Sequence, residues 1–68
     1  MTVGARVKQT LAGLKGAHST LRVYATQTLN EETKTVFQEA MASCGEVMAD
    51  LEKRLQTLEL EEPQYKGK

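Results

Sequence analysis

Two stripes of mainly apolar residues, each repeating at spacings of three and four, run through the 68-residue chain. A strand would alternate with a period of two, whereas a helix brings residues three and four apart onto one face. Neither half of the chain alternates, so both halves are predicted to be long amphipathic helices. The first stripe consists of Val7, Leu11, Leu14, His18, Leu21, Ala25 and Thr28, and the second of Phe37, Met41, Cys44, Met48, Leu51, Leu55 and Leu58.

The stretch TLNEET, at residues 28–33, separates the two stripes. Asn30 is expected to cap the second helix, because its side-chain oxygen can accept from a free backbone N–H. Thr28 with Glu31 offers an alternative capping box one turn earlier. The prediction is a single domain with helix 1 over about 3–28, a turn over about 28–31, helix 2 over about 31–61 and a C-terminal tail at 62–68.

So short a turn makes the two helices antiparallel. Facing positions of the two stripes then fall in shared layers, and one such layer pairs His18 with Cys44. The same alignment brings two basic and two acidic residues together along one flank, namely Lys8, Lys15, Glu52 and Glu59. Exposed ion pairs of this kind contribute ~1 kcal/mol or less each, so they are expected to orient the helices rather than stabilise them.

Each stripe is broader than the line along which two helices touch. A single core in a chain this short rarely supplies more than roughly 3–5 kcal/mol. The one cysteine cannot form an internal disulfide, so self-association is the expected way to bury more apolar surface. The predicted fold class is all-α: two long helices in an antiparallel hairpin that dimerises into a four-helix bundle.

Charge is uneven along the chain, although the net charge is zero. Residues 1–30 contain four bases and no acid, and residues 31–68 contain nine acids against five bases. The two halves are expected to neutralise each other, and nucleic acid is not an expected partner because it requires more cations on one face. No apolar run approaches the ~18 residues of a membrane span, and the N-terminus lacks a signal peptide's apolar core. The expected location is the cytoplasm.

His18 and Cys44 are the candidate metal ligands. A homodimer built around their shared layer would bring together two histidines and two cysteines, the residue types of a tetrahedral zinc site. A thiolate beside an imidazole could also act as a nucleophile. The competing interpretation, which we favour, is that Cys44 is a small buried hydrophobe and that His18 points to the bundle edge. On this interpretation the chain has no catalytic residue, cofactor or metal and is not an enzyme.

Small residues form a strip on each helix, comprising Ala5, Ala12, Gly16 and Ser19 on the first and Ala42, Gly45 and Ala49 on the second. Small side chains allow backbones to approach closely, so these strips are expected to contact a second hairpin or a foreign helix. A glycine inside a helix costs roughly 1 kcal/mol relative to alanine. A packing contact would offset that cost, and replacing Gly16 with leucine is then expected to weaken assembly.

The periodic pattern ends at Pro63, which cannot continue a helix without losing a hydrogen bond. Tyr65 follows it and is the aromatic residue outside the predicted helices. Two roles are open to this side chain. It either folds back near Val3 and Leu58, at the open end of the hairpin, or binds a partner.

Both ends of the chain, MTVGARVKQTLAGLKGAHSTL and EEPQYKGK, resemble a small family of spore-forming bacteria whose function is not known. The residues carrying the resemblance are 2–4, 7–11, 14–16 and 62–67. Members of that family stand beside genes for stage V sporulation protein A membrane components. The resemblance implies an interaction module that contributes no catalytic residues. It also implies a place in the forespore or at the inner face of the spore membrane, beside a membrane protein.

Overall fold

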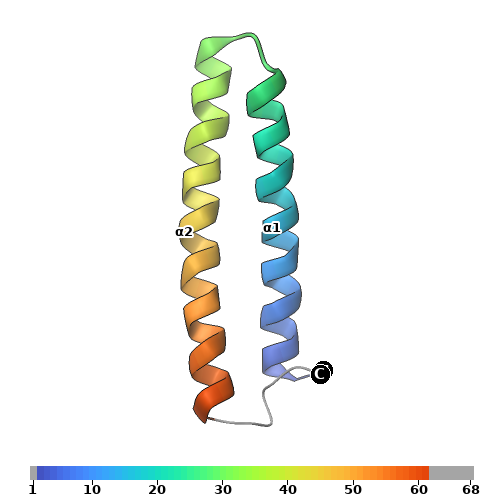
Figure 1. Cartoon of the computed structure of the whole chain (residues 1–68), viewed down its shortest axis with the longest axis vertical. Coiled ribbons are helices and arrows are strands. Elements are labelled where there is room, and N and C mark those ends of the chain that lie inside the picture. The colour runs from blue at the N-terminus through green and yellow to red at the C-terminus, as the bar shows by residue number, and fades with distance from the viewer. Residues whose placement is uncertain (1, 62–68) are drawn as a thin grey trace.

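The computed structural model describes residues 2–61, which form two α-helices. Helix α1 spans Val3–Gln27 and helix α2 spans Glu31–Glu61. The helices run antiparallel, side by side, and a short connection joins them at one end (Figure 1). No strand occurs among the described residues, and the predicted all-α helical hairpin is confirmed. Helix α1 ends one residue before its expected limit, and the predicted tail lies outside the described residues.

Side chains cap the N-termini of both helices. Asn30 Oδ1 accepts a hydrogen bond from the Thr33 N–H at 2.9 Å, which confirms Asn30 as the cap of α2. Thr28, the alternative cap, instead accepts from the Asn30 N–H at 3.4 Å, within the turn. At the start of α1, Thr2 Oγ1 accepts from the Ala5 N–H at 3.0 Å. This cap was not predicted from the sequence.

The two apolar stripes meet along a seam between α1 and α2, and every member of both stripes is buried or half-buried. Leu11 and Ala25 are 8% exposed and Leu55 is 9% exposed. No side chain among the described residues is completely enclosed. Two helices shield only the line along which they touch, so most seam residues keep one edge in solvent.

Contacts across the seam agree with the antiparallel alignment expected from the sequence. Near the turn, the rings of Tyr24 and Phe37 have centroids 5.7 Å apart and planes tilted by 48°. Further along, Cys44 Sγ donates to the Leu14 backbone carbonyl at 3.5 Å. The hairpin is a single layer of two helices with principal extents of 48 × 17 × 11 Å (Figure 1). Both broad sides of this layer therefore face solvent.

Candidate interaction surfaces

One broad side of the hairpin carries ion pairs between the helices. Lys8 Nζ lies 3.6 Å from Glu59 Oε2, and Lys15 Nζ lies 3.9 Å from Glu52 Oε1. These side chains are 28–59% exposed, so each pair contributes ~1 kcal/mol or less. We call this side the charged face; its residues beside the seam are Lys8, Lys15 and Arg22 of α1 and Gln38, Gly45, Glu52 and Glu59 of α2.

The opposite broad side is nearly free of charge beside the seam. In each heptad of a paired helix, one residue lies directly beside the seam on each of its two sides, and we call these residues flanking positions. Because the ion-paired positions occupy one side, the other flanking positions occupy the opposite side. We call this side the uncharged face; it comprises Val3, Thr10, Ala17 and Tyr24 of α1 and Thr33, Ala40 and Val47 of α2. The next flanking position on α2 is Arg54, whose Nε donates to Asp50 Oδ2 at 2.9 Å.

Large apolar side chains on the uncharged face are poorly covered. Tyr24 is 50% exposed, Val47 is 49% exposed and Val3 is 47% exposed. Single exposed hydrophobic residues are normal on a protein surface. Here they recur along one face whose flanking positions carry no charge before Arg54, and such a surface is typical of an interaction site.

Two open hollows extend the uncharged face at its ends. The hollow nearest the turn has a volume of about 380 Å³ and is lined by Tyr24, Gln27, Thr28 and Phe37. The hollow at the other end has a volume of about 490 Å³ and is lined by Val7, Asp50, Leu51, Lys53, Arg54, Thr57 and Leu58. Partly exposed seam residues therefore add apolar area to both ends of this face, and at the second end Asp50, Lys53 and Arg54 also add charge.

Cys44 and His18 both lie on the seam and are half-buried. The Cys44 thiol donates to the Leu14 carbonyl and lies 3.8 Å from Met48 Sδ. Such surroundings suit a small hydrophobe with a weak S–H donor. No group of three or more His, Cys, Asp or Glu that could hold a metal occurs in the described part of the chain. A zinc site of the predicted kind would therefore need ligands from two copies.

The small residues that the sequence analysis singled out lie away from the uncharged face. Gly45 belongs to the charged face, and Ala42 and Ala49 are exposed on the adjoining surface of α2. Gly16 is exposed on the outer surface of α1. A Cβ added at Gly16 or Gly45 would meet nothing within 4 Å. Packing between α1 and α2 therefore does not require glycine at either position. Their role as contact points stays a prediction.

The sequence model of the family described as "Protein of unknown function (DUF1657)" matches residues 7–55. The chain belongs to this family. The matched residues include the turn and most of the seam on both helices. No curated protein and no solved structure matches this family member. Within the described residues, neither helix combines the length and the apolar character that crossing a membrane requires.

Sequence reasoning located the seam of this family member but missed the contrast between its two flanks. Val3, Thr10, Ala17 and Tyr24 were assigned no role as a face from the sequence. The signal was present in the heptads, because one flanking position is repeatedly charged and the other is repeatedly uncharged. Tyr65, the remaining predicted contact residue, lies outside the described residues.

Proposed function

We propose that this chain is a non-catalytic assembly module that pairs with a second copy of itself through the uncharged face. One observation supports this pairing above the others. Tyr24, Val47 and Val3 are each about half exposed along one face. The charge at the end of that face, on Arg54, is paired with Asp50 on the same helix.

A second copy is the occupant that fits this face best. Two hairpins stacked through their uncharged faces would form a four-helix bundle, the arrangement in which broad apolar stripes converge on a common core. The charged faces would remain in solvent on the outside. A two-fold axis would place the same patch on both partners, as in most homodimers.

Electrostatics favour the same arrangement. Pairing two copies through the charged face would take its lysines and glutamates out of water and bring some like charges together, and both effects are costly. The uncharged face brings no such repulsion when it meets its own copy. Burying apolar surface stabilises an assembly by about 25 cal/mol per Å². Burial at a dimer interface would therefore add to the stability of a chain whose own core is small.

The experiment is sedimentation equilibrium of the wild type, Val47→Glu and a matched control, Val23→Glu. Val23 is the same residue type and is 48% exposed, but it lies on the outer surface of α1. We expect a dimer for the wild type and for Val23→Glu. Val47→Glu should dimerise at least tenfold more weakly, because dimerisation would bury its carboxylate. Circular dichroism checks that both variants remain helical.

Two results would contradict the proposal. One is a wild type that is monomeric at tens of micromolar. The other is an equal loss of dimer in both variants, because a general effect of added negative charge would then explain the change.

We also propose that the bundle acts beside a membrane protein, in the forespore or at the inner face of the spore membrane. Support for this location comes from the resemblance to a family of spore-forming bacteria. Fractionation of sporulating cells that express a tagged chain provides the test. We expect the chain in the membrane fraction of forespores, released by detergent. Recovery in the supernatant after gentle lysis without detergent would oppose this location.

A further inference from the structure

The ion pairs between the helices on the charged face do not continue toward the turn beyond Lys15 and Glu52. Seven residues beyond Lys15 on α1 stands Arg22, and seven residues before Glu52 on α2 stands Gly45. The third position of the series thus has its cation but lacks the carboxylate that would pair with it. Neither Arg22 nor the nearby Lys34 forms a salt bridge with any described residue.

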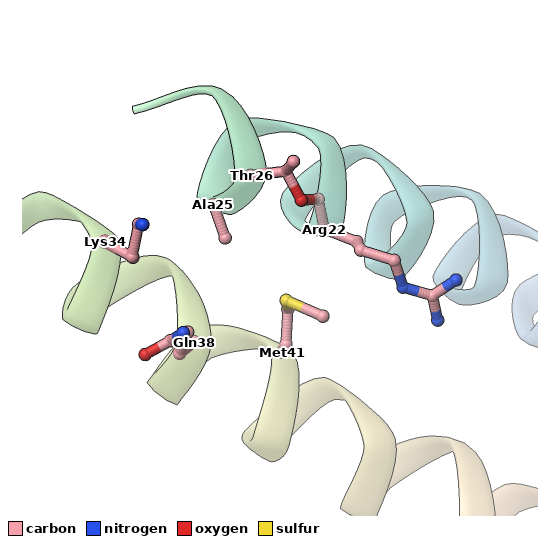
Figure 2. Close-up of a pocket in the computed structure, with 6 residues that line it drawn as sticks. All are labelled: Arg22, Ala25, Thr26, Lys34, Gln38 and Met41. Carbon is pink, nitrogen blue, oxygen red and sulfur yellow. The ribbon is translucent and has the colours of Figure 1, made fainter. Parts of the chain in front are cut away.

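An open hollow of about 390 Å³ lies where the series is interrupted. Figure 2 shows Ala25 of α1 and Met41 of α2 directed into the gap between the helices, with Arg22 extending along it past Met41, away from Lys34. Lys34 and Gln38 project from α2 on the same side, and Thr26 completes the lining. The hollow therefore combines an apolar floor with two cations and a side-chain amide, and no acid lines it.

We propose that this hollow binds an acidic side chain of a partner protein, with a neighbouring apolar side chain of the partner resting on Ala25 and Met41. Arg22 offers a planar set of N–H donors that matches a carboxylate. Toward the turn, Lys34 adds a second positive charge to the hollow and Gln38 an amide donor. The partner's carboxylate supplies to Arg22 the acid that the chain itself lacks, because position 45 is a glycine.

The form of the hollow favours a side chain over a free small anion. Sites for small molecules enclose 70–90% or more of their ligand, whereas this hollow is open to solvent along one side. A carboxylate held by a partner backbone needs less enclosure, because other contacts keep it in place. A nucleic-acid backbone would need several cations in a row, but Lys8 and Lys15 are already paired with glutamates.

This inference is independent of the proposed dimer. The hollow lies on the charged face, which stays in solvent when two hairpins meet through their uncharged faces. Sedimentation tests the dimer, and ligand titration tests the hollow. One proposal can therefore fail without affecting the other.

The test is an NMR titration of the ¹⁵N-labelled full chain with the peptide acetyl-Glu-Leu-Leu-Glu-amide. Parallel titrations use its glutamine twin, acetyl-Gln-Leu-Leu-Gln-amide, and inorganic phosphate. We expect the acidic peptide to shift the amide signals of Arg22, Lys34, Gln38 and Met41. The glutamine peptide and phosphate should bind at least fivefold more weakly. Equal binding by the glutamine peptide, or tighter binding by phosphate, would overturn the proposal.

Variants locate the site within the chain. Arg22→Gln and Lys34→Gln should each weaken peptide binding about tenfold. The matched control Arg6→Gln removes a cation near the other end of α1 and should leave binding unchanged. Equal weakening by all three variants would overturn the proposal, because it would show attraction to net charge alone.

A third variant supplies the missing carboxylate from within the chain. An added Cβ at Gly45 meets nothing within 4 Å, so Gly45→Glu can be accommodated without displacing a neighbour. Its carboxylate should pair with Arg22 and abolish the shifts caused by the acidic peptide. Unchanged peptide binding in the folded Gly45→Glu variant would overturn the assignment of this hollow.

Discussion

The thiol of Cys44 donates a hydrogen bond to the backbone carbonyl of Leu14 across the helix interface, with 3.5 Å between sulfur and oxygen. The contact joins residues of α2 and α1 near the middle of the hairpin. It leaves the thiol directed at a carbonyl and at the thioether of Met48. In this structure Cys44 therefore acts as a packing residue of the seam.

Cys44→Ala should destabilise the protein by about 1 kcal/mol, because it removes the thiol's packing and its weak hydrogen bond. Urea unfolding at one fixed protein concentration measures the change. The exposed neighbour Ser43 provides the control, and Ser43→Ala should change stability by less than about 0.5 kcal/mol. Equal stability of wild type and Cys44→Ala would show that the contact with Leu14 contributes nothing.

Asn30→Ala should cost about 1 kcal/mol, because the Thr33 N–H would lose its side-chain acceptor at the start of α2. Thermal unfolding followed by circular dichroism measures this loss. Asn30→Asp keeps an acceptor oxygen and should remain close to the wild type. Thr28→Ala should cost less than Asn30→Ala, because its hydroxyl accepts only a longer bond within the turn. The reverse order would make Thr28 the more important of the two residues.

The pair Lys15 and Glu52 should show a coupling energy below about 1 kcal/mol in a double-mutant cycle, because both side chains are largely exposed. The cycle uses Lys15→Ala, Glu52→Ala and the double variant in low salt. Repeating it at about 1 M salt should remove most of the coupling, because the screening length falls to about 3 Å. Strong coupling that persists in high salt would indicate a pair better shielded than the structure describes.

Gly16→Ala should stabilise α1 by about 0.5–1 kcal/mol, because glycine weakens a helix interior and an added methyl meets open space. Ala49→Gly, on the exposed surface of α2, should cause a loss of similar size. Unfolding midpoints at equal protein concentration test both changes. A destabilised Gly16→Ala variant would reveal a close contact at Gly16 from a second copy or partner.

Gly16→Leu distinguishes two locations for the dimer interface. If two copies meet through the uncharged face, the dissociation constant should stay within about twofold of the wild type, because Gly16 is on the outer surface of α1. If they meet through the small-residue strips, the leucine would hold the backbones apart and weaken the dimer. Sedimentation equilibrium separates these outcomes.

The heptad pattern and the capping residues determined most of the fold. Side chains seven residues apart recur on one helix face whatever that face contacts, so periodicity alone was enough to locate the seam from Val7 to Leu58. Asn30 could be identified as a cap for a similar reason, because it acts on backbone groups three residues away. The pairing of Lys8 and Lys15 with Glu59 and Glu52 followed once the turn made the helices antiparallel.

The local sequence pattern did not predict features that depend on side-chain contacts between the two helices. The sequence shows a thiol and an imidazole in one layer, but only the packed hairpin directs Cys44 toward Leu14 and Met48. Likewise, Gly16 and Gly45 look like close-packing positions in sequence, whereas α1 and α2 leave open space beside both.

The sequence by itself determined two helices, their antiparallel order and the residues of the seam, because these depend on periodicity and on contacts between near neighbours. Only the tertiary structure decided how far each residue is covered and which groups meet across the seam. It left Tyr24 and Val47 about half exposed, and it directed the Cys44 thiol at the Leu14 carbonyl. The physical reason is that a helix presents every residue type at its surface, while the rotation and alignment of two packed helices select the side chains that meet.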